Sequence, residues 1–230
     1  MAKYNLLMTG GRPSAPYKAL PAADVALNAT NELTTPAFPV VLERHHIIPD
    51  NKLRNFWNQM VANNHLGSAA GAYLTTFNNN VTLYDLTIDA GDVSEVQELL
   101  SEIKAGLTTH DPNEPAPGNR LVNFSSIFSY LPGNIMLGPV HGGGENQRDD
   151  DPGDAFEATA QVVTGADRFR RLEAANSKID KYLVSNKSAD ALAACAELSE
   201  VAKRRSYYDL SVTKDAWRRK VNNRYCLKTV

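Results

Sequence analysis

The chain has 230 residues, with 24 Lys and Arg against 26 Asp and Glu, and 43% of its residues are hydrophobic. This length supports one substantial core, or a core with an attached lobe. The ordinary apolar content, balanced charge and two cysteines exclude a collagen, a disulfide-stapled miniprotein and a fully disordered chain. We expect a soluble globular protein in which Cys195 and Cys226 are reduced packing residues.

The hydropathy of the chain gives no sign of a membrane protein. The longest apolar stretches fall far short of the roughly 20 residues that a membrane-spanning helix needs. The first eleven residues lack the apolar region of a secretory signal. We therefore expect no membrane partner, synthesis in the cytoplasm, and delivery to a target cell, if any, by a route that needs no signal peptide.

The charges are unevenly distributed. Residues 85–115 hold eight carboxylates against one lysine, and residues 201–230 hold nine basic residues against two carboxylates. One interpretation is two solvated faces that attract each other. The other is a basic surface for a phosphate backbone, for which the candidate nucleic-acid-binding residues are Arg44, Arg218, Arg219, Lys220 and Arg224.

The first half of the chain combines an irregular segment with helices. Residues 1–40 are rich in Pro, Gly, Ala, Thr and Asn, which predicts irregular structure. A short apolar run over 38–42 predicts a strand leading into two adjacent histidines. Apolar residues three and four apart predict a helix that opens near Asp50 or Asn51, and a second helix over 93–107.

The second half begins with a Pro-rich loop at 110–119 and a turn, strand and turn over 131–139. From residue 154 onward the pattern is mostly helical. Three apolar stripes support this prediction: Phe169, Leu172, Ile179 and Leu183; Ala189, Leu192, Ala196 and Val201; Trp217, Val221 and Tyr225. We expect an α+β fold, predominantly α-helical, that forms a single domain over residues 1–230.

The adjacent pair His45–His46 is the first candidate for chemistry. Adjacent residues of a strand point to opposite faces, so the two rings cannot play the same role. At the end of the strand one ring can bind a metal while the other faces a substrate. The alternative is one ring packed in the core and one in solvent.

The residues around this pair carry a family resemblance. The stretch Glu43-Arg44-His45-His46-Ile47-Ile48-Pro49 resembles the motif that begins HNH nucleases, the ββα-metal-finger (His-Me finger) endonucleases, and above all their branch of secreted bacterial toxins. Asn134 in a turn and His141 seven residues later follow in the order of that family. The separation of 88 positions from His46 to Asn134 exceeds the few tens in compact members and requires a helical insertion.

The resemblance implies a role for each matching position. It makes His45 and His141 metal ligands and His46 the general base that deprotonates the attacking water. Asn134 orients the base or completes the metal shell. Such a site uses one divalent ion, and imidazole suits Zn, Ni or Mn while a mixed nitrogen and oxygen site can also hold Mg.

The resemblance also implies an activity and an organisation. It predicts a metal-dependent endonuclease that cleaves phosphodiester bonds, in DNA rather than RNA, and an antibacterial toxin with a cognate immunity protein. The metal-finger core then spans 40–64 and 130–165, with a helical insertion at 65–129 and a C-terminal helical lobe with a basic end at 166–230. The alternatives are a ribonuclease with the same site, or a non-catalytic binding module with a structural metal or none.

A charged run over 148–157 follows the last histidine. One interpretation is a helix N-terminus with Asp151 or Asp154 as its cap. The other places Arg148 in the catalytic site, where it clamps the scissile phosphate while one Asp supports the metal or a ligand histidine. The two interpretations are compatible with each other.

Overall fold

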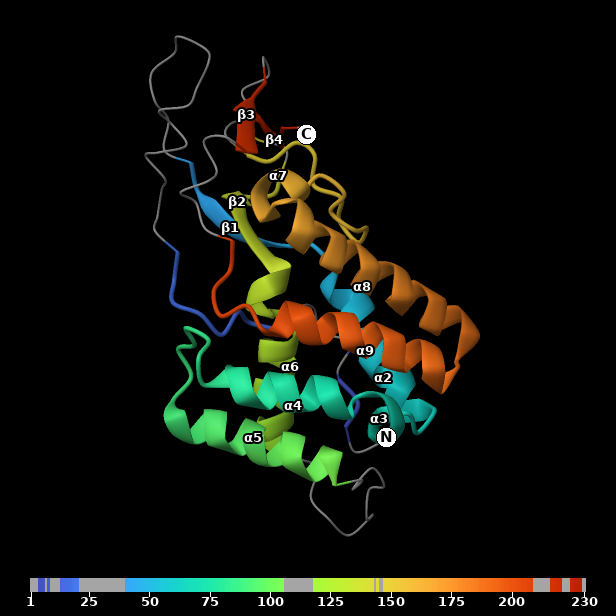
Figure 1. Cartoon of the computed structure of the whole chain (residues 1–230). Helices are drawn as coiled ribbons and strands as arrows, with labels where there is room; N and C mark the ends of the chain where they lie inside the picture. Colours follow the sequence, from blue (N-terminus) through green and yellow to red (C-terminus); the bar gives the residue numbers. More distant parts are fainter. Residues whose placement is uncertain are drawn as a thin grey trace.

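The computed structural model describes residues 4–6, 8, 13–20, 40–105, 118–142, 144, 147–208, 216–220 and 224–228. Helices dominate the described residues, and two antiparallel sheets of two strands each complete the fold (Figure 1). The predicted α+β, mainly helical class is therefore confirmed. Most of the irregular segment predicted at 1–40 lies outside the described residues, as does the loop predicted at 110–119 except for its last two positions.

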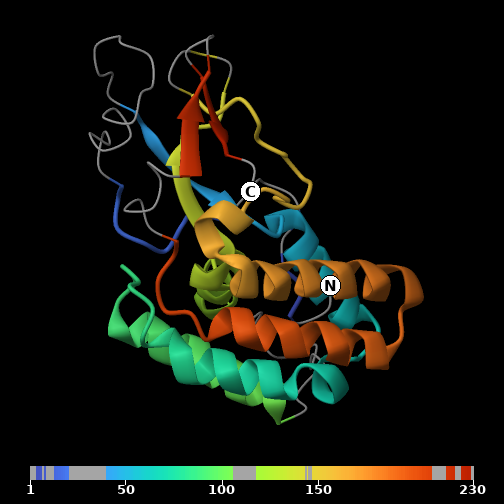
Figure 2. The same ribbon diagram turned by 45° about the horizontal axis from the view of Figure 1, so that its top comes forward.

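Stacked helices form the larger part of the molecule. Helices α8 (Ala166–Ser185) and α9 (Ser188–Ala202) are joined by a tight connection at Asn186, whose positive φ of 54° ends α8. Helix α9 packs against α4 (Gly71–Val81), and α4 packs on α5 (Ala90–Lys104). Figure 2 shows these layers one above the other, with both sheets at one end.

Aromatic side chains fill the core behind these layers. Helix α2 (Asp50–Ala62) confirms the helix predicted from Asp50 and brings Trp57 against Phe124 and Phe128 of α6 (Gly118–Ser129). Trp57 is fully buried. The short helix α3 (Leu66–Ala69) follows α2. Within the described ranges, no helix is both long and apolar enough to cross a membrane.

The first sheet pairs strands that are far apart in the chain. Strand β1 (Leu42–His46) is antiparallel to β2 (Ile135–Pro139), with His45 opposite Met136 and His46 opposite Ile135. A 3-10 turn, η1 (Pro132–Asn134), leads into β2, so the predicted turn and strand are confirmed. The first strand begins four residues later than predicted and contains both histidines.

The C-terminal lobe ends in strands, where a helix was predicted. Strand β3 (Trp217–Arg219) pairs antiparallel with β4 (Tyr225–Leu227), Trp217 opposite Leu227. The four-residue spacing from Trp217 to Tyr225 fits a helix, but burial alternates along β3 as it does in a half-buried strand. The helix predicted from Trp217, Val221 and Tyr225 was therefore wrong, whereas α8 and α9 agree with the mostly helical pattern.

The apolar stripe predicted for α9 also has the wrong phase. Leu192 is 50% exposed, whereas the buried face carries Ala191, Ala194, Cys195 and Leu198. Small side chains on this face let α9 approach both α8 and α4 closely, and a buried thiol behaves as a small hydrophobic group. Size and packing, rather than the largest apolar residue, thus determine which face is inside.

Candidate functional site

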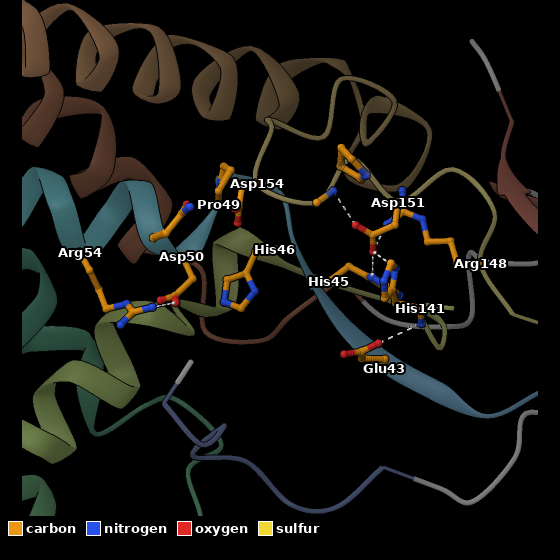
Figure 3. Close-up of a pocket in the computed structure, with 13 residues that line it drawn as sticks. Glu43, His45, His46, Pro49, Asp50, Arg54, His141, Arg148, Asp151 and Asp154 are labelled. Atoms are coloured by element: carbon orange, nitrogen blue, oxygen red, sulfur yellow. Dashed lines mark hydrogen bonds and ion pairs between the residues drawn. The ribbon is translucent and has the colours of Figure 1, made fainter. Parts of the chain in front are cut away.

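Four of the five predicted catalytic and metal-binding residues line one cavity of about 400 Å³, namely His45, His46, His141 and Arg148. The cavity lies where β1 ends, α2 begins and the segment 148–154 passes. Figure 3 shows His46 between the start of α2 and a cluster of His45, His141 and Asp151. The fold thus brings together residues that are about a hundred positions apart in the sequence.

His46 is the last residue of β1, and its ring packs against Tyr130 with ring centroids 4.7 Å apart. Its Nε2 atom lies 3.0 Å from the carbonyl oxygen of Ser129. Because a carbonyl oxygen only accepts, Nε2 carries the proton and Nδ1 of the neutral ring has the lone pair. Nδ1 is covered from solvent in the structure.

Asn134 lies behind the cavity and holds the loop that follows His46. Its Oδ1 accepts the backbone N–H of Ile48 at 2.7 Å, and its Nδ2 donates to the carbonyl oxygen of Ile48 at 2.8 Å. The side chain is almost fully buried, and both amide atoms are engaged. Asn134 is therefore a positioning residue, and the alternative that it completes a metal shell does not fit.

His45 points to the opposite side of β1 from His46. Its Nε2 atom donates to the carbonyl oxygen of Pro139 at 2.8 Å, which leaves Nδ1 directed at the carboxylate of Asp151, 3.3 Å away. Two electron-rich atoms face each other at this contact. A second proton on the ring, or a bound cation, is needed to satisfy both.

Asp151 joins the two predicted metal ligands. The same oxygen, Oδ2, lies 3.3 Å from Nδ1 of His45 and 3.6 Å from Nδ1 of His141. When Nδ1 of His45 also carries a proton, its hydrogen bond to Asp151 holds the pKa of that carboxyl well below its usual range, and the backbone N–H of Gly153 and the charge of Arg148 act in the same direction against the effect of burial. Asp151 is therefore ionised at neutral pH.

These donors fit a divalent ion by their chemistry. Ligand bonds of about 2.1 Å in a tetrahedral site place neighbouring donor atoms about 3.4 Å apart. The two contacts of Asp151, at 3.3 and 3.6 Å, match that spacing. Among the residues that the structure describes, no group of three or more His, Cys, Asp or Glu forms a complete metal site. Two donor pairs thus have the spacing of a metal site, although the described residues do not form a complete one.

The charge of the cavity also favours a cation. Four carboxylates line it against two guanidinium groups, an excess of two negative charges when the histidines are neutral; the carboxylates are Glu43, Asp50, Asp151 and Asp154. Such a wall attracts a divalent cation and repels a phosphodiester that arrives alone. The exposed ring of His141, whose side chain is 67% accessible, leaves one side open.

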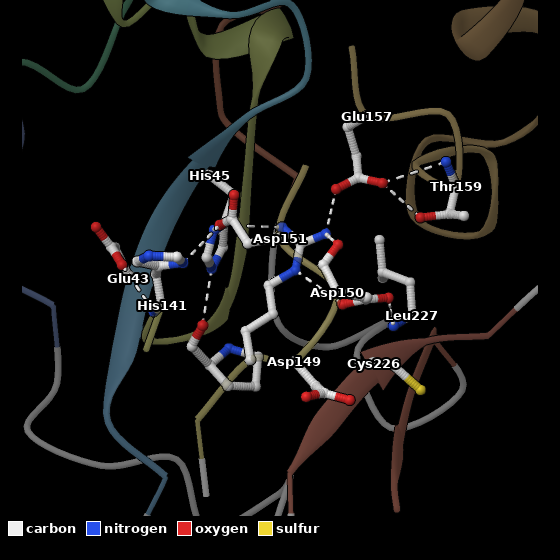
Figure 4. A network of polar contacts seen from close by, with 12 residues as sticks. Glu43, His45, His141, Asp149, Asp150, Asp151, Glu157, Thr159, Cys226 and Leu227 are labelled. Carbon is white, nitrogen blue, oxygen red and sulfur yellow. Dashed lines mark hydrogen bonds and ion pairs between the residues drawn. The ribbon is translucent and has the colours of Figure 1, made fainter. Parts of the chain in front are cut away.

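Arg148 lies in the cavity wall but does not match its predicted role as a phosphate clamp. Its side chain is 1% exposed and contacts the carboxylates of Asp150, Asp151 and Glu157, three residues labelled in Figure 4. Its guanidinium also lies over the ring of Trp217, 5.2 Å from the centroid. A buried cation with these partners supports the segment that carries Asp151 and is not available to a phosphate.

The segment 148–157 is not a helix N-terminus either, which corrects the other interpretation of this run. The helix that follows, α7, spans only Gln161–Thr164. The second carboxylate oxygen of Asp151 accepts the backbone N–H of Gly153 at 2.7 Å, which forms a local turn. The prediction that one of these Asp residues supports a ligand histidine agrees with the position of Asp151.

The predicted nucleic-acid-binding residues near the C-terminus are largely engaged elsewhere. Lys220 and Arg224 form ion pairs with Asp149 at 2.6 and 2.9 Å. Arg219 is 6% exposed. The exposed Arg218 donates from Nε to the sulfur of Cys226 at 3.2 Å. These contacts tie the β3–β4 hairpin to the segment 147–150, so the cluster does not form a free basic surface.

Arg44, the remaining nucleic-acid-binding candidate, also has a structural role. Its guanidinium donates to the carbonyl oxygen of Lys18 at 2.7 Å. It lies between the rings of Tyr17 and Tyr207, at 5.3 and 5.2 Å from their centroids. The contacts fasten the segment 13–20 to the outer face of β1.

Sequence reasoning missed the buried pair at the other end of the cavity. Asp50 and Arg54, one turn apart on α2, are both 5% exposed and form an ion pair at 2.6 Å. Their i,i+4 spacing was visible in the sequence, but it is typical of a solvated helix face. Only the position of α2 directly after His46 brings them into the cavity.

Comparisons with known proteins give one relationship and no family. No family model matches the chain, and no solved structure matches it. The chain is 29% identical over 157 residues to protein p9 of Acyrthosiphon pisum secondary endosymbiont phage 1. This region covers 64% of the chain and 41% of the phage protein, so the chain spans less than half the length of this curated relative.

Proposed function

We propose that this protein is a metal-dependent endonuclease that hydrolyses phosphodiester bonds, with DNA as its substrate. The observation that carries the proposal is the convergence of His45, His46, His141 and Asp151 on one open cavity. A site in which three protein ligands leave a position open is typical of catalytic rather than structural metal sites. This favours the nuclease over a binding module with a closed metal.

His45, His141 and Asp151 would hold the ion. Two imidazole nitrogens and one carboxylate oxygen favour Zn, Ni or Mn over Mg. When bound, the ion would supply positive charge to stabilise the charge that develops on the phosphate and leaving oxygen. The carbonyl oxygen of Pro139 fixes the ring of His45 through Nε2–H, as a backbone group often does for a ligand histidine.

His46 would act as the general base. With its proton on Nε2 held by Ser129, the ring has Nδ1 as its proton acceptor, and an imidazole suits this task near neutral pH. A water molecule that loses its proton to Nδ1 would attack phosphorus while the bond to the leaving oxygen breaks. Asn134 would keep the loop after His46 in place through Ile48.

The test separates metal binding from catalysis. Purified protein is incubated with supercoiled plasmid, or with a folded RNA, in Mg, Mn, Ni or Zn and in EDTA, and metal affinity is measured by calorimetry. We expect His45→Ala and His141→Ala to lose both metal binding and nicking. His46→Ala should keep metal binding and lose nicking by about 100- to 10,000-fold.

His65→Ala is the matched control, because His65 lies on the far side of α2 against Tyr182 and does not line the cavity. It should nick plasmid at the wild-type rate. Wild-type protein that binds metal but leaves DNA and RNA intact would overturn the proposal in favour of the binding module. Cleavage of RNA alone would replace DNA as the substrate. The antibacterial role and the immunity protein stay predictions of the resemblance.

A further inference from the structure

A second cavity, of about 510 Å³, lies away from the histidines, between the start of α8 and the end of α9. The segment after α9 closes it and runs along the free edge of β2, where the backbone N–H and carbonyl of Tyr208 bond to Ile135 and Leu137. Gly133 contributes to its wall, and the next residue, Asn134, holds the loop after His46. The cavity thus backs onto the turn that supports the candidate active site.

Basic residues predominate in this second cavity. Five line it, against the two carboxylates of Asp167 and Glu200; they are Arg168, Arg171, Lys203, Arg204 and Arg205. Both carboxylates already have basic partners. Asp167 pairs with Arg170, outside the cavity, and Glu200 pairs with Lys203 at 2.5 Å. Arg171 also pairs with Glu197, at 3.2 Å, so three of the five basic residues have no carboxylate partner among the described residues.

Three arginines show this excess directly. Arg168 and Arg205 are exposed, and neither forms an ion pair with a carboxylate of the described residues. The guanidinium of Arg204 lies 4.0 Å from the ring centroid of Tyr208, and its Nε is buried without a hydrogen-bond acceptor in the described part of the chain. Burial and, to a smaller extent, the charge of Arg168 lower the pKa of Arg204. Positive charges gathered in this way are stabilised by an anion.

We propose that this cavity binds phosphate groups of a nucleic-acid backbone, at a site separate from the histidine cavity. The choice of nucleic acid rests on the proposed function; the choice of an anion rests on the charges alone. Guanidinium groups match phosphate geometry through paired N–H donors, and α8 begins without a side-chain cap on its first N–H groups. A strand bound here would be held near the turn that carries Asn134, and the cavity would anchor the substrate.

The test measures binding without cleavage. A fluorescent DNA duplex is titrated with protein in EDTA, and anisotropy is followed at several salt concentrations. The double variant Arg168→Gln/Arg205→Gln is compared with Arg170→Gln, a matched change on α8 that lies outside the cavity. We expect the double variant to bind roughly tenfold or more weakly at ~0.1 M salt, with a log–log salt slope smaller by about two. Arg170→Gln should behave almost as wild type.

Equal DNA affinity of the double variant and Arg170→Gln would overturn this inference. The inference would also be overturned if the wild type bound poly-glutamate as tightly as DNA and the double variant lost both affinities equally. This result would indicate an acidic protein partner. A protein that cleaves no plasmid but shows the expected loss of binding would refute the nuclease and support this site. Thermal melting of each variant, whose replaced side chains are exposed, verifies that it is folded.

Discussion

Replacement of Asn134 by alanine tests how the loop after His46 is held. The change removes two hydrogen bonds, of 2.7 and 2.8 Å, and leaves the N–H and carbonyl of Ile48 without these partners in a buried place. An unsatisfied buried backbone group costs about 1–3 kcal/mol, so the free energy of unfolding should fall by about 2–5 kcal/mol. With an m-value of about 2.5 kcal/mol/M, the urea midpoint should move down by about 1–2 M.

Asn58 provides a control of the same chemistry. Its Oδ1 and Nδ2 bond to the N–H and carbonyl of Leu6 at 2.6 and 2.8 Å, but in a half-buried place that water can reach. Asn58→Ala should therefore cost less, about 1–3 kcal/mol for the two bonds. Unfolding is followed by tryptophan fluorescence in urea. A loss below about 1 kcal/mol in Asn134→Ala, or one no larger than that of Asn58→Ala, would refute the role assigned to Asn134.

Three further predictions concern packing, reactivity and pH. Gly138→Ala would place a Cβ 2.3 Å from the buried indole of Trp217 and should lower the free energy of unfolding, measured by thermal melting, by about 1–3 kcal/mol. In the control Gly67→Ala the new Cβ meets no atom within 4 Å, so stability should be unchanged or slightly higher. Burial raises the pKa of the Cys195 thiol to about 12, so in a Cys226→Ser background DTNB should react at pH 8 only after urea is added. Hydrogen bonds from Lys220 and Arg224 lower the pKa of Asp149. The contribution of Asp149 to stability is therefore present above the unfolded pKa of about 3.9 and is lost as the pH falls. The urea midpoints of wild type and Asp149→Asn should differ at pH 7 and converge near pH 2.

For each of these three predictions, one outcome would contradict the reasoning. An unchanged melting temperature for Gly138→Ala would mean that the indole of Trp217 does not pack against Gly138 of β2. Rapid labelling of the native thiol would contradict the burial of Cys195 on α9. A difference between wild type and Asp149→Asn that persists at low pH would show that the contribution of Asp149 does not depend on its charge.

The sequence predicts what depends on local periodicity and misses what depends on tertiary contacts. The helix from Asp50 and the turn and strand around Asn134 follow from spacing and turn chemistry, and both were predicted. The face of α9 that is buried depends on the neighbours α8 and α4, which no single-helix pattern contains. The strands near the C-terminus have only three residues each, too few for a periodic signal.

In the candidate site, too, local sequence features were predicted and tertiary contacts were missed. The histidines stood out because their pairing and motif are local, and the fold brings His45, His46 and His141 to one cavity. The role predicted for Arg148 was wrong because the sequence shows a cation near acids but not which of them surround it. The pairing of Lys220 and Arg224 with Asp149, more than 70 positions away, was likewise out of reach.

The pairing of β1 with β2 also affects when the candidate site is assembled during synthesis. Leu42 lies opposite Pro139, 97 positions later in the chain, and closure of so long a loop carries an entropic cost that local helices do not bear. Helices such as α2 and α4 can therefore form early, while the sheet must wait for distant partners. A ribosome that has translated α2 has made His45 and His46 but neither His141 nor Asp151. The candidate site of the growing chain thus stays incomplete until residues up to 151 have emerged and docked.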